Sequence, residues 1–206
     1  AGTGSVFRTD GSVSLDASIQ TSDGRMGFVI GMGETPNPIR VAASLLDEDI
    51  NGLCGDGATY WADEKGFKRS QVQGRKPFGG ATDTVGVLTR DRGGLIACAT
   101  STGGCSDMPP GRVGDVPLPG SGFWVQEGVG VGATGIGEAI TRGLLSFKVA
   151  ELISKGGEIE KSMMQALDDS IEEGAEVGII ALSSEGTGHG ISNSENMPWS
   201  SWIARK

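Results

Sequence analysis

Short apolar runs bounded by Gly, Asp and Ser recur along the chain, and they predict strands joined by tight turns. Two short strands around an Asp-Gly turn are expected within residues 6–15. The β-rich runs 84–90 and 95–100, separated by Asp-Arg-Gly-Gly, predict a hairpin. Residues 177–182 and 189–192, joined by Ser-Glu-Gly-Thr-Gly, predict a second hairpin near the C-terminus.

Helical spacing of apolar residues indicates three helices. The first covers residues 39–49, where Asn37 can cap the helix and Pro38 fits its first position. The other two cover residues 137–155 and 158–173, and each ends at glycine. Strands, then two helices, then strands again favour a layered α/β arrangement with an antiparallel sheet.

Length and composition limit the chain to one domain. It has 206 residues, of which 37% are hydrophobic, so it can bury a core, and its 36 glycines indicate many turns. Residues 63–83 are polar, basic and Gly-rich, which predicts an exposed linker and the single internal boundary. A Pro- and Gly-rich loop is expected over residues 103–122.

Charge and residue counts exclude several classes of function. The formal net charge is −9, without any Lys- or Arg-rich block, so nucleic-acid binding is not expected. No apolar run approaches the roughly 20 residues that span a bilayer, and no signal peptide is visible. Three cysteines match no zinc or CxxC spacing and are interpreted as free thiols of a cytoplasmic protein. The single histidine, His189, is expected at the surface or at a strand edge.

Residues 130–135 have the formal pattern G-x-G-x-x-G, and Glu151 follows about 20 residues later. One interpretation of this pattern is a dinucleotide site, in which the glycines let a pyrophosphate approach a helix N-terminus. The context disfavours it, because a βαβ unit needs a strand after the helix and a second helix is expected there.

A second set of motifs is longer and more specific. It comprises Asp-Thr-Val-Gly at 83–86, Ser-Thr-Gly-Gly at 101–104, the segment 110–122 beginning Pro-Gly-Arg-Val-Gly-Asp, and Thr-Gly-Ile-Gly-Glu at 134–138. In this order they resemble the plant-type asparaginase, isoaspartyl aminopeptidase and glycosylasparaginase family of N-terminal-nucleophile (Ntn) hydrolases. The resemblance covers nearly the whole chain, although members of that family ordinarily carry an additional N-terminal stretch.

The resemblance implies a four-layer αββα sandwich with largely antiparallel sheets. It also implies an α-segment, residues 1–83, and a β-segment, residues 84–206, released by self-cleavage between Asp83 and Thr84. Thr84 would be the nucleophile in both self-cleavage and hydrolysis. A free α-amino group has a pKa of roughly 7.7 to 8.0, so the new terminus could act as the base without histidine.

The same resemblance assigns roles to five further residues. Thr102 would hydrogen-bond and orient Thr84, and Thr134 with the amide of Gly135 would form the oxyanion hole. Arg112 would bind the α-carboxylate of an aspartyl substrate and Asp115 its α-ammonium. The alternative for these two is a local ion pair that stabilises the loop.

The implied reaction is hydrolysis of the side-chain amide of L-asparagine or of a β-aspartyl (isoaspartyl) dipeptide. No cofactor or catalytic metal is implied, and the expected assembly is a homodimer of αβ units. Glycosylasparaginase activity is the nearest alternative, favoured by the Asp83-Thr84 pair. An inactive relative serving as a binding or assembly module is an alternative of another class.

Overall fold

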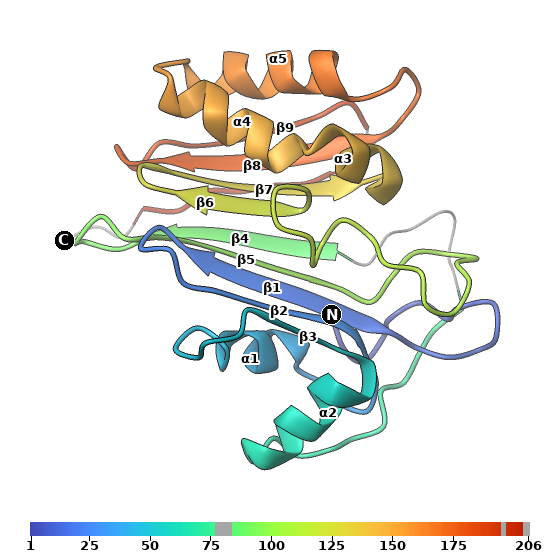
Figure 1. Ribbon diagram of the computed structural model, residues 1–206. Helices are drawn as coiled ribbons and strands as arrows, with labels where there is room; N and C mark the ends of the chain where they lie inside the picture. The colour runs from blue at the N-terminus through green and yellow to red at the C-terminus, as the bar shows by residue number, and fades with distance from the viewer. Residues whose placement is uncertain (77–83, 195–196, 204–206) are drawn as a thin grey trace.

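The computed structural model describes residues 1–76, 84–194 and 197–203, and its strands form two sheets (Figure 1). The first sheet has the order β3-β2-β1-β5-β4 and is antiparallel except for the β2–β3 pair. Its strands are β1 (Leu15–Thr21), β2 (Met26–Met32), β3 (Gly52–Cys54), β4 (Thr84–Arg90) and β5 (Ile96–Thr102).

The second sheet is antiparallel throughout and has the order β6-β7-β8-β9. Its strands are β6 (Phe123–Gln126), β7 (Val129–Gly135), β8 (Val177–Ser183) and β9 (Gly188–Ser192). The described chain is therefore a mixed α/β protein with two largely antiparallel sheets, as the sequence predicted.

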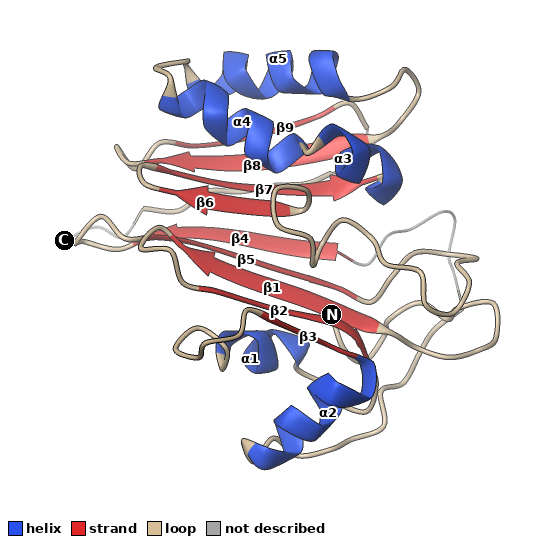
Figure 2. Ribbon diagram, in the orientation of Figure 1, coloured by secondary structure: helices blue, strands red, loops and turns tan. Residues whose placement is uncertain are grey.

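Helices pack on the outer side of each sheet, and the inner sides face one another (Figure 2). The first sheet is covered by α1 (Pro38–Ala43) and α2 (Gly55–Glu64). The second is covered by α3 (Gly137–Gly143), α4 (Leu145–Ser154) and α5 (Ile159–Ser170). A buried cluster of Ile96, Cys98, Phe123 and Val125 fills the space between the sheets. No helix in the described ranges is long and apolar enough to cross a membrane.

Glycines in β7 let the two sheets approach closely. A Cβ atom on Gly130 would lie 2.8 Å from Ile96 Cγ2 of the opposite sheet, which is closer than real side chains allow. Residues 129–135 are a strand, hydrogen-bonded to β6 and β8, and not a loop that opens a helix. The dinucleotide reading of this glycine pattern is therefore wrong, and the glycines serve sheet packing instead.

Polar side chains on the inner side of β1 and β5 fasten the following loop to the sheet. The hydroxyls of Ser18 and Thr100 both donate to the carbonyl of Val116, at 2.9 and 3.2 Å. Further along β1, Gln20 Oε1 accepts from the Val125 N–H at 2.9 Å. Because buried polar groups are costly unless paired, these bonds fix the end of the long loop 103–122 over β1 and β5.

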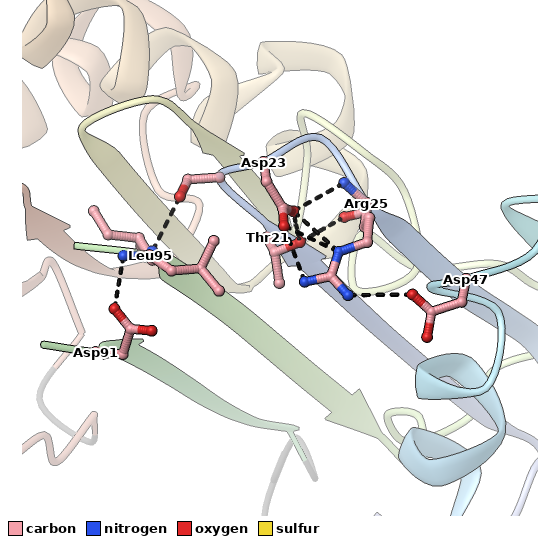
Figure 3. A network of polar contacts seen from close by, with 8 residues as sticks. Thr21, Asp23, Arg25, Asp47, Asp91 and Leu95 are labelled. Carbon is pink, nitrogen blue, oxygen red and sulfur yellow. Dashed lines mark hydrogen bonds and ion pairs between the residues drawn. The ribbon is translucent and has the colours of Figure 1, made fainter. Parts of the chain in front are cut away.

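Charged side chains hold the β1–β2 turn (Figure 3). Arg25 Nε donates to both carboxylate oxygens of Asp23, at 3.0 and 3.2 Å, and Arg25 Nη1 reaches Asp47 Oδ1 at 3.2 Å. These bonds from Arg25, with one from the Thr21 hydroxyl, lower the pKa of Asp23 to about 2. Because all of these charged side chains are well exposed, the ion pairs fix the conformation of the turn but add little to the free energy of unfolding.

The predicted hairpin at 84–100 is present as β4 and β5, and its turn is closed by the Asp91 side chain, which accepts from the Leu95 N–H at 2.9 Å (Figure 3). The predicted hairpin near the C-terminus is β8 and β9, and the last predicted helix is α5. These predicted elements are confirmed. The residues that indicate each of them lie within the element itself.

Other predicted elements differ from the structure. The expected strand pair within residues 6–15 is absent: Val6 forms an isolated bridge with Arg75, and Leu15 already belongs to β1, which pairs with β2 in the first hairpin. The expected helix 39–49 ends at Ala43. The expected helix 137–155 is divided into α3 and α4 at Leu144, whose φ is 48°. Helix α2 has no counterpart among the predicted elements.

The described part of the expected linker is largely exposed but hydrogen-bonded to the N-terminal segment. The Gly4 N–H donates to the Gln73 carbonyl at 2.7 Å, and the Arg75 N–H donates to the Ser5 carbonyl at 2.8 Å. Residues 77–83 lie outside the described ranges. The described chain resumes at Thr84, which begins β4.

Candidate active site

Two threonine hydroxyls meet at the start of β4. Thr84 is directly opposite Thr102 of β5, and its Oγ1 donates to Thr102 Oγ1 at 3.0 Å. The Gly104 N–H also donates to Thr102 Oγ1, at 3.1 Å. Thr84 is half-buried and Thr102 is buried, so Thr102 fixes the hydroxyl of Thr84. Asp83, the other residue of the expected cleavage site, lies outside the described residues.

A buried carboxylate, Asp16, continues this row across the sheet. Asp16 is directly opposite Thr102 on the other neighbour of β5, and its Oδ1 accepts from the Gly31 N–H at 2.7 Å. Burial raises the pKa of Asp16, while that hydrogen bond and the charges of Arg8 and Arg112 oppose the rise. Sequence reasoning assigned Asp16 no role, and β1 mixes polar and apolar residues, so its carboxylate does not stand out from the pattern.

Arg112 pairs with Glu138 of α3 and not with Asp115. Arg112 Nε and Nη2 each donate to one carboxylate oxygen of Glu138, both at 2.9 Å. The Arg112 side chain is only 16% exposed, whereas that of Glu138 is 49% exposed. The alternative of a local Arg112–Asp115 pair therefore does not describe this loop. Behind the loop, Arg8 donates to the carbonyls of Pro109 and Arg112, at 2.7 and 3.0 Å.

Asp115 is a buried carboxylate with an unused oxygen. Its Oδ2 has no hydrogen-bond partner among the described residues. Burial raises the pKa of Asp115 to about 7, and the carboxylates of Glu138 and Asp16 add to the rise. Its own backbone N–H and the charge of Arg112 act in the opposite direction. A buried polar atom without a protein partner is costly, so its retention calls for an explanation such as a role in binding.

Two glycines make room around Arg112 and Asp115. A Cβ atom on Gly137 would lie 2.7 Å from Asp115 Oδ1 and 2.8 Å from Arg112 Nη2. A Cβ atom on Gly114 would lie 2.6 Å from Arg112 Nη1. Asp115 and Arg112 therefore both pack against the backbone of Gly137, where no side chain would fit without displacing them.

Thr134 and Gly135 are the last residues of β7, immediately before α3. Gly135 has a φ of 136°, and a Cβ atom there would lie 2.2 Å from the Glu176 carbonyl oxygen. Only glycine fits at this position. Figure 1 shows the start of β4, the end of β7 and the loop 103–122 on the same side of the molecule.

An open cavity of about 420 Å³ adjoins this cluster. Its lining includes Arg8, Ser12, Ser14, Cys54, Gly111 and Arg112. A second, polar cavity of about 260 Å³ lies beside α2 and Arg69. The first is the one that a ligand held by Arg112 could extend into.

The whole chain is similar in sequence to one family of known proteins. The asparaginase family model matches residues 1–75 and 68–206. This chain belongs to the asparaginase family. The plant-type L-asparaginase of Pyrobaculum calidifontis is 37% identical over 193 residues, which are 82% of this chain and 64% of that protein. The isoaspartyl peptidase of Salmonella typhimurium is 32% identical, covering 96% of this chain and 73% of its own length.

A third asparaginase-family relative is the N(4)-(beta-N-acetylglucosaminyl)-L-asparaginase of Elizabethkingia miricola. It is 30% identical over 205 residues, which are 86% of this chain and 60% of that protein. The chain thus spans a little under two thirds of the length of two of these three relatives. Relatives with different named substrates therefore match at similar identity.

The remaining chemistry-bearing residues of this asparaginase-family chain lie elsewhere. His189 is half-buried on the edge strand β9, with Nε2 3.6 Å from Glu160 Oε1 of α5 and its ring beside Trp199. Cys54, Cys98 and Cys105 form no disulfide with one another. Within the described ranges no group of three or more His, Cys, Asp or Glu residues could hold a metal ion.

Proposed function

We propose that the protein is an amidohydrolase that cleaves the side-chain amide of L-asparagine or of β-aspartyl dipeptides. The observation that carries the proposal is the unused buried oxygen of Asp115 beside the guanidinium of Arg112. Two opposite charges that lie near one another without pairing suit an α-ammonium and an α-carboxylate on the same carbon. The names of the Pyrobaculum and Salmonella relatives support this substrate class.

In this proposal Thr84 attacks the side-chain carbonyl carbon of the substrate. Cleavage of the Asp83–Thr84 peptide bond makes the α-amino group of Thr84 the base that takes the hydroxyl proton. The hydroxyl of Thr134 and the amide of Gly135 stabilise the oxyanion of the tetrahedral intermediate. That intermediate collapses to a β-aspartyl ester on Thr84, and the amine leaves with the proton. Water, activated by the same amino group, then hydrolyses the ester to aspartate.

The finer form of the fold belongs to the same proposal. Helices on the outer side of each sheet support a four-layer αββα sandwich of the Ntn-hydrolase type, with α-segment 1–83 and β-segment 84–206. We further propose a homodimer of αβ units in the cytoplasm, acting on a small-molecule substrate.

Glycosylasparaginase activity is the second candidate, supported by the name of the Elizabethkingia relative. The two activities share the aspartyl end of the substrate and differ in the leaving group. Parallel assays of L-asparagine, a β-aspartyl dipeptide and GlcNAc-asparagine therefore rank the candidates by kcat/KM.

The test of the nucleophile is Thr84→Ala, with Thr89→Ala as a matched control on an exposed position of the same strand. Intact mass spectrometry should show two fragments for the parent protein and for Thr89→Ala, and one chain for Thr84→Ala. Thr84→Ala should also release no ammonia from asparagine, because alanine lacks the attacking hydroxyl. A parent protein that stays uncut and releases no ammonia would favour the inactive binding module instead.

A further inference from the structure

Glu138 has a place in the site that no mechanistic step above uses. It occupies the Nε–Nη2 edge of Arg112 with both carboxylate oxygens, at 2.9 Å each. The fork geometry fixes the plane of the guanidinium, since two parallel bonds allow little rotation. The remaining nitrogen, Nη1, packs over Gly114, where a Cβ atom would lie only 2.6 Å away.

Asp115 is the competing partner for the same guanidinium. It lies close enough for Arg112 to lower its pKa, yet no hydrogen bond or ion pair joins the two within the described chain, and Asp115 Oδ2 has no partner. Both side chains pack against the same point of the backbone, since a Cβ atom on Gly137 would lie 2.7 Å from Asp115 Oδ1 and 2.8 Å from Arg112 Nη2. A buried carboxylate without a partner beside a guanidinium would gain strongly by pairing with it.

We propose that Glu138 is a positioning residue that holds Arg112 away from Asp115. The two opposite charges then stay apart and open to the two ends of a zwitterionic amino acid. Without Glu138, the Arg112 guanidinium would form an ion pair with the Asp115 carboxylate. Neither charge would then be available to a ligand. The inference rests on the proposed function and deepens it, because it assigns the recognition of the α-amino-acid end to three residues and not two.

Electrostatics are consistent with this role. Glu138 neutralises Arg112 before a ligand arrives, so the guanidinium does not fully compensate Asp115. Three charged groups act on Asp115: Arg112 lowers its pKa, while Glu138 and Asp16 raise it. If Arg112 pairs directly with Asp115, the pKa of Asp115 must fall, because an opposite charge in contact favours the ionised carboxylate.

The test replaces Glu138 in the whole protein and measures binding and turnover separately. Glu138→Ala should raise the KM for L-asparagine about 10- to 100-fold, the range expected for losing charge-assisted contacts, with kcat changed by only a few-fold. L-Aspartate binding, measured by calorimetry, should weaken by a similar factor at pH 8. Glu138→Gln, which keeps one acceptor for Arg112, should restore part of the loss and serves as the second variant if Glu138→Ala does not fold.

The pH dependence distinguishes positioning from a merely structural role. In the parent protein L-aspartate binding should weaken as pH falls through about 7, because Asp115 becomes protonated. In Glu138→Ala that weakening should begin at lower pH. The matched control is Glu172→Ala, which removes the exposed Arg142–Glu172 pair of the same residue types and should change neither quantity.

The outcomes separate the two levels of the argument. A folded Glu138→Ala protein with unchanged KM and an unchanged pH dependence of L-aspartate binding would overturn the positioning role while leaving the proposed function intact. A parent protein that neither binds L-aspartate nor hydrolyses asparagine would overturn both.

Discussion

The buried carboxylate of Asp115 should make the protein less stable at the pH where the site is ready to bind. Its pKa is raised from 3.8 to about 7, mainly by burial. One pKa unit corresponds to about 1.4 kcal/mol, so keeping this group ionised costs the folded state roughly 4 kcal/mol at most. Between pH 4 and 7 the folded protein holds a proton that the unfolded chain has released. The free energy of unfolding should therefore fall as pH rises through that window and level off above it.

Asp115→Asn removes this charge while keeping the shape of the side chain. The variant and the parent protein should be compared by urea unfolding at intervals from pH 5 to pH 8. Relative to the parent, the variant should become steadily more stable as pH rises from 5 to about 7, by roughly 2 to 3 kcal/mol, because about two pKa units of the shift lie in that range. The comparison cancels most of the effect of Asp16, whose raised pKa acts in the same direction.

The free energy of unfolding of Asp115→Asn at a single pH is less informative than its pH dependence. The new amide N–H group would be buried where Asp115 Oδ2 has no partner, and this adds a cost of its own. Asp168→Asn on the exposed face of α5 removes an equal charge and serves as the control. Parallel pH dependences for Asp115→Asn and the parent would refute the reasoning, since they would mean that Asp115 titrates alike in the folded and unfolded chain. The same variant should lose asparagine hydrolysis, because nothing then binds the α-ammonium.

Three further variants test the surroundings of the site. Arg112→Lys keeps the charge but cannot make the planar fork, so kcat/KM for asparagine should fall on the order of 10²-fold; unchanged kinetics would return Arg112 to a loop-stabilising role. Gly137→Ala should reduce turnover similarly, because its Cβ would displace Asp115 and Arg112 from their positions. His189→Gln should leave the pH–rate profile unchanged, because His189 faces Glu160; a lost activity in a folded variant would make histidine the base.

Elements with local signals were predictable from the sequence. The β4–β5 and β8–β9 hairpins are short apolar runs on either side of Gly-rich turns. Helix α5 buries Met163 and Ala166, which stand three residues apart, as a helical face requires. In each case the residues that decide the structure lie within the element itself.

Elements decided by distant contacts were not predictable. From the sequence Gly130 resembles a loop glycine. It lies in β7, where a side chain would clash with Ile96 of the other sheet. The break between α3 and α4 follows Gly143, whose Cβ position would lie 2.8 Å from the Ser170 carbonyl oxygen at the end of α5. Such packing between elements leaves no periodic signal in the sequence.

The candidate site divides in the same way. The motifs were sufficient to bring Thr84 to Thr102, since both flank one strand pair. They did not reveal that Arg112 forms its ion pair with Glu138, 26 residues away, and not with Asp115, three residues away. Sequence proximity favours the nearer carboxylate, whereas the fold buries Asp115 and turns Glu138 of α3 toward the guanidinium.

The most costly feature of the structure coincides with the region proposed to bind substrate. A buried carboxylate without a partner, a half-buried guanidinium and a glycine at the start of a helix each lower stability or contribute nothing to it. A zwitterionic ligand would offset the first two costs, because its ammonium pairs with Asp115 and its carboxylate pairs with Arg112. Stabilisation by L-aspartate should consequently be greatest where Asp115 is ionised, above pH 7. The preorganised charges thus trade folding stability for recognition of one end of the substrate, and this is the trade expected of an active site.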